Sequence, residues 1–84
     1  MHYIMLMKLR KKPDKATLQE IQKIKDKLEK NGGMLFFTLG GYDLIWHIRA
    51  KNEVSALKIA LAFSKIASTE TLPAISIEDA AKLV

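Results

Sequence analysis

The 84-residue sequence contains no cysteine, and histidine, proline, glycine and aromatic residues are all scarce. Without cysteine the chain forms no disulfide, and a thiolate nucleophile and a cysteine-based metal site are excluded. The two histidines, His2 and His47, lack the short spacing typical of zinc ligands. We therefore predict no metal site, no cofactor, and a small, marginally stable core that favours oligomerisation.

The sequence also lacks an apolar run of membrane-spanning length. The apolar stretch Met1–Met7 is too short to cross a bilayer. It has neither the preceding basic segment nor the cleavage site of a signal peptide. No repeat or linker divides the chain. These features predict one domain over residues 1–84, a cytoplasmic location and no membrane partner.

The net charge of +5 is concentrated in one segment. Residues 8–30 hold nine lysines and arginines against four acidic residues, and the remaining charges cancel. A basic segment can attract nucleic acid, but this one is dominated by lysine, contains no aromatic residue and fits a solvated helix face. The aromatic pattern of an RNA-recognition sheet is absent as well. We therefore predict no specific nucleic-acid partner.

Hydrophobic patterning predicts strands that alternate with helices. Strand-length apolar runs occupy residues 3–9, 34–39, 42–50 and 69–77, and helical spacing occupies a segment after Pro13, residues 52–67 and a short stretch over 78–84. Pro73 lacks an N–H donor, so the last strand should lie at a sheet edge. The order βαββαβ predicts an α+β, ferredoxin-like sandwich, with a four-stranded antiparallel sheet and two helices on one face.

Residues typical of helix ends flank the two main helices. Asp14, or Thr17 together with Glu20, is predicted to begin the first helix, and Asn31-Gly32-Gly33 to end it. Asn52 is the predicted N-cap of the second helix. The buried side of that helix is predicted to contain Val54, Leu57, Ala60, Leu61, Ser64 and Ile66, although Ile59 and Phe63 are also apolar.

The pair Gly40-Gly41 between two apolar runs predicts a tight β-hairpin. A two-residue loop fixes the register, so that Phe37 faces Leu44 and Met34 faces His47. Side chains then alternate between two faces. The apolar face, expected beneath the helices, contains Leu35, Phe37, Leu39, Tyr42, Leu44, Trp46 and Ile48. The mixed face contains Met34, Phe36, Thr38, Asp43, Ile45, His47 and Arg49.

The mixed face predicts a contact surface. Two helices cover only one side of a four-stranded sheet, which leaves Met34, Phe36 and Ile45 exposed beside Ile4 and Leu6 of the first strand. A contiguous apolar patch of this kind usually marks an interface. We predict that a second copy stacks its sheet here, so that the partner of the chain is itself, in a homodimer or a larger homo-oligomer.

Two short motifs resemble those of the GYD-domain family. The stretch Thr38-Leu39-Gly40-Gly41-Tyr42-Asp43 contains the triplet that names the family, and Thr69-Glu70-Thr71-Leu72-Pro73-Ala74 is similar to its terminal-strand motif. Ser68 and Ile75 depart from the pattern. The resemblance covers nearly the whole chain and implies a dimeric α+β barrel without implying an activity. The Tyr-Asp-Leu-Ile stretch is also similar to ligand-sensing domains of feed-or-famine transcription regulators, which implies a small molecule, such as an amino acid, between subunits.

Asp43 is the first candidate ligand-binding residue. It lies next to the turn, on the mixed face, opposite Thr38. A carboxylate there can bind a ligand amine or act as a base. The alternative is that Asp43 accepts hydrogen bonds from turn amides and stabilises the hairpin.

Three further candidates are His47, Arg49 and Tyr42. His47 offers proton transfer and Arg49 bidentate carboxylate binding, although both also suit interface salt bridges. Asp43, His47 and Arg49 are spaced by roughly 13 and 7 Å along one strand, too far apart for a hydrogen-bonded triad. Tyr42, like Trp46, fits the core as well as a site.

These residues support two classes of function. The first is an oligomeric small-molecule-binding or assembly module that holds its ligand between subunit sheets. The second is a small enzyme of the dimeric-barrel type, such as an isomerase or a cofactor-free oxygenase, whose acid and base meet across subunits. The sequence assigns no catalytic residue and does not identify the ligand.

Overall fold

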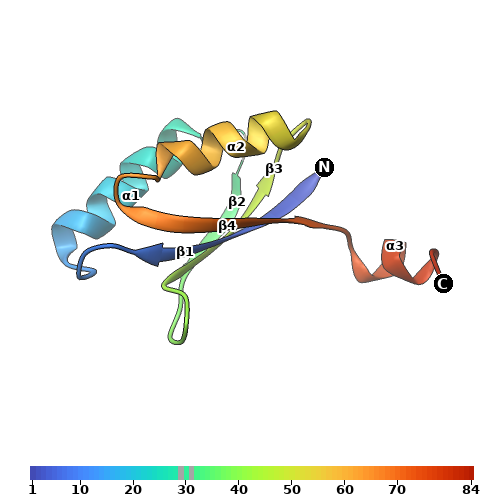
Figure 1. Cartoon of the computed structure of the whole chain (residues 1–84), viewed down its shortest axis with the longest axis horizontal. Coiled ribbons are helices and arrows are strands. Elements are labelled where there is room, and N and C mark those ends of the chain that lie inside the picture. The colour runs from blue at the N-terminus through green and yellow to red at the C-terminus, as the bar shows by residue number, and fades with distance from the viewer. Residues whose placement is uncertain (29, 31) are drawn as a thin grey trace.

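Four strands form the frame of the protein. The computed structural model describes residues 1–28, 30 and 32–84, and its strands are β1 (His2–Leu9), β2 (Gly32–Phe37), β3 (Leu44–Arg49) and β4 (Ala67–Ala74). They pair antiparallel in the order β2-β3-β1-β4. Helices α1 (Lys15–Lys27) and α2 (Glu53–Ala62) lie on the same face of this sheet, and the short helix α3 (Ile77–Ala81) projects beyond it (Figure 1). The predicted ferredoxin-like fold is confirmed.

The core lies between the sheet and the two long helices. Alternate residues of the central strands point into it, because successive strand side chains face opposite ways. Trp46 of β3 is fully buried and packs edge-on against Phe63, with ring centroids 5.7 Å apart. The other buried apolar residues include Tyr3, Met5, Met7, Ile21, Leu44, Ile48, Ala56, Ile59 and Ala60. Within the described residues, none of the helices is both long and apolar enough to cross a membrane.

Strand β4 lies at one edge of the sheet, as Pro73 predicts. It pairs with β1, and Pro73 stands opposite Tyr3. A strand with one neighbour has amides that need no ladder partner, so a residue without an N–H is tolerated there.

Side-chain caps begin both long helices. An Asp14 carboxylate oxygen accepts a hydrogen bond from the Thr17 amide at 2.8 Å, and this bond lowers the pKa of Asp14. The first helix therefore begins after Asp14, and the alternative start at Thr17, which is buried, is wrong. Asn52 caps α2 in the same way through the Ser55 amide. Of the predicted helix end, Asn31 lies outside the described residues, while Gly32 belongs to β2.

The buried side of α2 differs in part from the prediction. Ala60 and Ile66 are buried as predicted, whereas Val54, Leu57, Leu61 and Ser64 are exposed. The helix also buries Ala56 and Ile59. The reason is that both sides of this helix are apolar, so periodicity alone does not select one. The small side chains of Ala56 and Ala60 suit a close approach of the helix to the sheet.

The hairpin register is as predicted near the turn and changes farther away. Phe37 faces Leu44, and Leu35 faces Trp46. The register then shifts between Gly32 and Leu35, so that Gly32 faces Ile48. The predicted pairing of Met34 with His47 is therefore wrong.

The large indole of Trp46 explains this shift. Its Nε1 donates a hydrogen bond to the Gly33 carbonyl at 3.3 Å, and its ring occupies the space where a Cβ on Gly32 would stand. The two glycines let the strand pass closely over the ring. Gly33 consequently lies beside His47.

We expect Gly32→Ala to destabilise the protein by about 1–3 kcal/mol, because the added methyl group overlaps the Trp46 ring in a packed core. The melting temperature should fall by at least several degrees, since about 1 kcal/mol corresponds to roughly 4–8 °C in a domain of this size. Gly41→Ala is the matched control, because a Cβ at Gly41 meets no atom within 4 Å. Equal melting temperatures for the two variants would contradict this account of the register shift.

Candidate functional site

The sheet face opposite α1 and α2, here called the open face, is apolar at its centre. Cross-strand pairing places Phe36, Ile45, Leu6 and Glu70 in one row, and His47, Ile4 and Leu72 in the next. Ile4, Leu6 and Ile45 are half-buried by their neighbours, whereas Phe36 on the edge strand is 52% exposed. The predicted mixed face therefore exists. The half-buried apolar residues Ile4, Leu6 and Ile45 form its centre, which is called the floor below.

One end of the open face carries a histidine pair. His2 of β1 and His47 of β3 have stacked rings, and Nδ1 of His2 lies 2.9 Å from Nε2 of His47. One nitrogen must donate and the other accept, so this bond exists only while one of them lacks a proton. Arg49 stands opposite His2 in the register and adds positive charge to this end. Within the described residues, no three side chains of the metal-binding types gather in one group.

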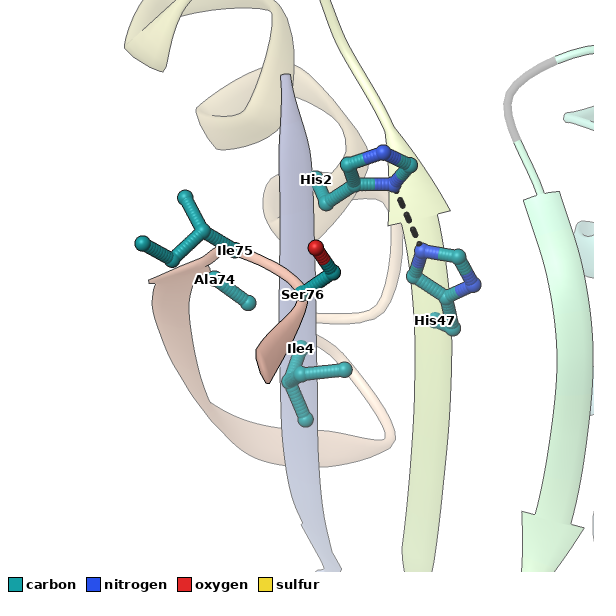
Figure 2. Close-up of a pocket in the computed structure, with 6 residues that line it drawn as sticks. All are labelled: His2, Ile4, His47, Ala74, Ile75 and Ser76. Atoms are coloured by element: carbon teal, nitrogen blue, oxygen red, sulfur yellow. Dashed lines mark hydrogen bonds between the residues drawn. The ribbon is translucent and has the colours of Figure 1, made fainter. Parts of the chain in front are cut away.

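A shallow pocket of about 310 Å³ lies next to the histidine pair (Figure 2). The sheet supplies His2, Ile4 and His47, and the chain leaving β4 supplies Ala74, Ile75 and Ser76. Its surface is therefore mostly aliphatic, with imidazole nitrogens and one hydroxyl as polar groups. A mostly apolar recess with a few polar groups is the usual composition of a small-molecule site.

The other end of the open face carries a second polar pair. The Tyr42 hydroxyl donates a hydrogen bond to a Glu70 carboxylate oxygen at 2.6 Å. Glu70 stands opposite Leu6 and so belongs to the open face. Because β1 lies between β3 and β4, the Tyr42 side chain reaches across β1 to make this contact.

The prediction that Tyr42 lies beneath the helices is wrong. Tyr42 is 38% exposed, and Leu39, also predicted for that face, is 99% exposed. The alternation fails because β3 begins only at Leu44, and the chain between Phe37 and Leu44 leaves the sheet as a projecting loop (Figure 1). Trp46, predicted for the same face, is in the core.

The bond to Glu70 raises the pKa of Tyr42, and the negative charge of that carboxylate acts in the same direction. Deprotonation would destroy the hydrogen bond and place two negative charges together. The phenol is thus a stable hydrogen-bond donor at neutral pH.

Asp43 connects the hairpin to β1. Its carboxylate accepts a hydrogen bond from the Leu9 amide at 2.8 Å, and its own amide donates to the Met7 carbonyl at 2.9 Å. The carboxylate thus takes the place of a backbone acceptor at the point where the hairpin leaves the sheet. This contact is related to the predicted turn-stabilising role, but the amide it satisfies belongs to β1.

The remaining candidates divide between the two ends. Thr38 lies with Asp43, since its hydroxyl donates to the Tyr42 carbonyl at 2.6 Å and its amide to the Asp43 carbonyl at 2.7 Å. His47 and Arg49 lie toward the histidine end. The structure therefore brings together Thr38, Tyr42 and Asp43, and separates them from His47.

Sequence reasoning did not assign His2, Glu70 or Ser76 to a site. His2 and Glu70 occupy even-numbered positions that alternation places on the open face. That signal was present, but their partners depend on the register of β1 against β3 and β4. Ser76 lies beyond β4, and no periodicity predicts where it points.

Comparisons with known proteins support the fold. No protein-family model matches the chain, and no curated protein sequence matches it either. Solved structures with a similar fold include B. subtilis LrpC, with a TM-score of 0.65 and 17% identity, and MtbAldR, with a TM-score of 0.65 and 11% identity. Each match covers 89% of this chain but only 50% and 51%, respectively, of those chains, so this chain spans about half their length. At these identities the similarity shows the fold alone.

We expect Asp43→Ala to cost about 1–3 kcal/mol of folding free energy, because the part-buried Leu9 amide loses its acceptor. Asp43→Asn keeps a side-chain oxygen and should cost less. Chemical denaturation of both variants measures the difference. If the two variants are equally stable, the hydrogen bond to Leu9 is not what Asp43 contributes.

The raised pKa of Tyr42 means that its bond to Glu70 stabilises the fold below pH 10.0 and ceases to do so as pH rises through the folded-state pKa.

Glu70→Gln should lower the pKa of Tyr42 toward the usual value of 10.0, because the carboxylate is the main cause of its increase. Tyrosinate absorbance during an alkaline titration reports this pKa. Burial raises the pKa of Tyr3 independently, so Tyr3 is an internal control, and Tyr42→Phe identifies the Tyr42 signal. An unchanged titration in Glu70→Gln would contradict the assignment.

Proposed function

We propose that the protein is a small-molecule-binding module that works as a homo-oligomer, with the ligand held between the open faces of two stacked subunits. The observation that carries the proposal is the composition of the open face. An apolar floor of Ile4, Leu6 and Ile45 lies between a histidine pair at one end and the Tyr42–Glu70 pair at the other. The floor favours burial, and the polar ends orient a ligand.

The need to cover this floor supports stacking of two sheets. Removing exposed apolar surface from water would stabilise the dimer by about 25 cal/mol per Å² buried. A stable dimer buries about 800 Å² on each partner, a modest part of the 6224 Å² surface of one chain. Stacked sheets pack about 10 Å apart, so polar groups at the two ends remain next to the space between them.

The resemblances are consistent with this proposal. Membership of the GYD-domain family stays a prediction that rests on the Gly41-Tyr42-Asp43 triplet and the Thr69–Ala74 stretch. The Tyr42–Ile45 stretch is similar to ligand-sensing domains of feed-or-famine transcription regulators, and the similarity to B. subtilis LrpC and MtbAldR agrees with this in fold. For this chain, the partner and the effector are part of the proposal.

The second candidate is a small enzyme that transfers a proton, as an isomerase does. The specific observation in its favour is the His2–His47 hydrogen bond beside an apolar pocket. One imidazole in such a pair can accept a proton from a bound substrate while its neighbour stabilises the charge. The two candidates differ in outcome, because a binding module returns its ligand unchanged.

Native mass spectrometry of freshly purified protein should show a dimer or a larger species that retains a small molecule. Ile45→Glu should convert it to folded monomers without that molecule, because a carboxylate in the floor cannot be buried between two sheets without a partner. Leu61→Glu is the matched control, because Leu61 is an exposed apolar residue on the helix side of the sheet. A monomeric wild-type protein would end the proposal.

The histidine pair is tested in the same experiment. His47→Gln keeps a polar side chain of similar reach and should preserve the oligomer while reducing ligand retention at least about tenfold, which corresponds to the loss of one good hydrogen bond. If His47→Gln retains the molecule as well as the wild type does, the histidine end is not part of the ligand site. Chemical conversion of the released molecule on incubation with the protein would favour the enzyme.

A further inference from the structure

The C-terminal segment, residues 75–84, here called the arm, extends away from the rest of the protein. It leaves the end of β4 and contains α3, which projects past the sheet along the longest dimension of the molecule, 44 Å (Figure 1). No residue of α3 is buried. In the arm, the apolar side chains of Ile77 in α3, Leu83 after it and Ile75 before it are 78%, 76% and 57% exposed.

A helix this short needs a surface to pack on. The helix has five residues, and isolated helices shorter than about 12–15 residues are marginal in water. Its start is nonetheless well formed, because the Ser76 hydroxyl accepts a hydrogen bond from the Asp79 amide at 3.1 Å. A capped helix with exposed apolar residues is typical of a segment that packs against something outside the chain itself.

The arm is amphipathic. At helical spacing, Ile77, Ala80 and Ala81 share one side, while Glu78 and Asp79 lie on the other. Both acidic residues are in the first turn of the helix, and Asp79 forms an ion pair with Lys82 of the arm at 3.8 Å. The three charges leave the arm with one net negative charge. A surface that suits the arm is therefore apolar and has positive charge beside it.

The open face has both properties. Its floor and its edge residues Phe36 and Leu72 are apolar, and the end that carries His2 also carries Arg49. The arm begins beside this end, since Ile75 and Ser76 line the pocket next to His2 (Figure 2). From there it runs outward, so it does not cover the floor of its own sheet (Figure 1).

We propose that the arm packs on the open face of a second copy. Ile77 would contact the apolar edge residues of that face, beside the stacked sheets, and Glu78 would lie near Arg49. This inference rests on the proposed stacking of two sheets and adds that each subunit completes the ligand space of the other. In a two-fold dimer the exchange is reciprocal, so each copy gives one arm and receives one.

Disulfide trapping tests the contact directly, because the natural chain has no cysteine. A tagged Ile77→Cys chain is co-expressed with an untagged Phe36→Cys or Leu72→Cys chain, and the purified protein is oxidised at micromolar concentration. Leu61→Cys is the matched control partner, since Leu61 is comparably exposed but lies on α2. Non-reducing electrophoresis separates the mixed disulfide by its mass and tag.

We expect at least one open-face cysteine to form the mixed disulfide about 100-fold faster than Leu61→Cys, because contact within a complex gives millimolar effective concentrations. Equal rates for all three partners would overturn the inference. So would an intrachain disulfide in the double variant Ile77→Cys/Phe36→Cys without any mixed disulfide, because the arm would then fold onto its own sheet.

Native mass spectrometry of the wild type separates this inference from the proposed function. A dimer that gives no mixed disulfide with the open face overturns only the placement of the arm. A monomer overturns both.

Discussion

The central constraint on this protein is that its two long helices cover only one face of a four-stranded sheet. Burial of Trp46, Phe63 and the alternate residues of β1 and β3 between that face and the helices supplies the core. The opposite face is then left to water, although its central residues Ile4, Leu6 and Ile45 are as apolar as many core residues. Other apolar residues, namely Val54, Leu57 and Leu61 of α2, are exposed on the opposite side of the molecule. In the proposed assembly, both stability and ligand binding would depend on the open face.

The polar groups of the open face lie where the strand pairing ends. At one end, the start of β1 meets β3, which places His2 against His47. At the other end, the hairpin leaves the sheet, which frees Tyr42 to reach Glu70 on β4. The first pair joins β1 to β3, the second joins the hairpin loop to β4, and each leaves the apolar centre open. A ligand that lies along the floor would meet a different kind of polar group at each end.

The open face also relates two features that are far apart in the sequence. The hairpin separates from β1 at Asp43, whose carboxylate completes the pairing of Leu9. The arm begins where β4 ends, beside His2. One segment projects at each end of the sheet (Figure 1). Both segments carry exposed apolar residues, Leu39 in the hairpin and Ile77 in the arm.

The sequence by itself determined the element order, the edge position of Pro73, the cap at Asn52 and the hairpin register near the turn. These follow from local rules: alternation in strands, the chemistry of helix ends, and the missing N–H of proline. It also placed His47 on a strand without showing what it contacts, whereas Asp43, predicted for the same strand, precedes β3.

Tertiary structure decided the rest. The buried side of α2 depended on which of its two apolar sides met the sheet, and the shift at Gly32 depended on the bulk of Trp46. The contacts His2–His47, Tyr42–Glu70 and Asp43–Leu9 join residues 45, 28 and 34 positions apart. Local pattern does not specify such pairs, because they depend on the register between strands, and that register is set by packing of the whole core.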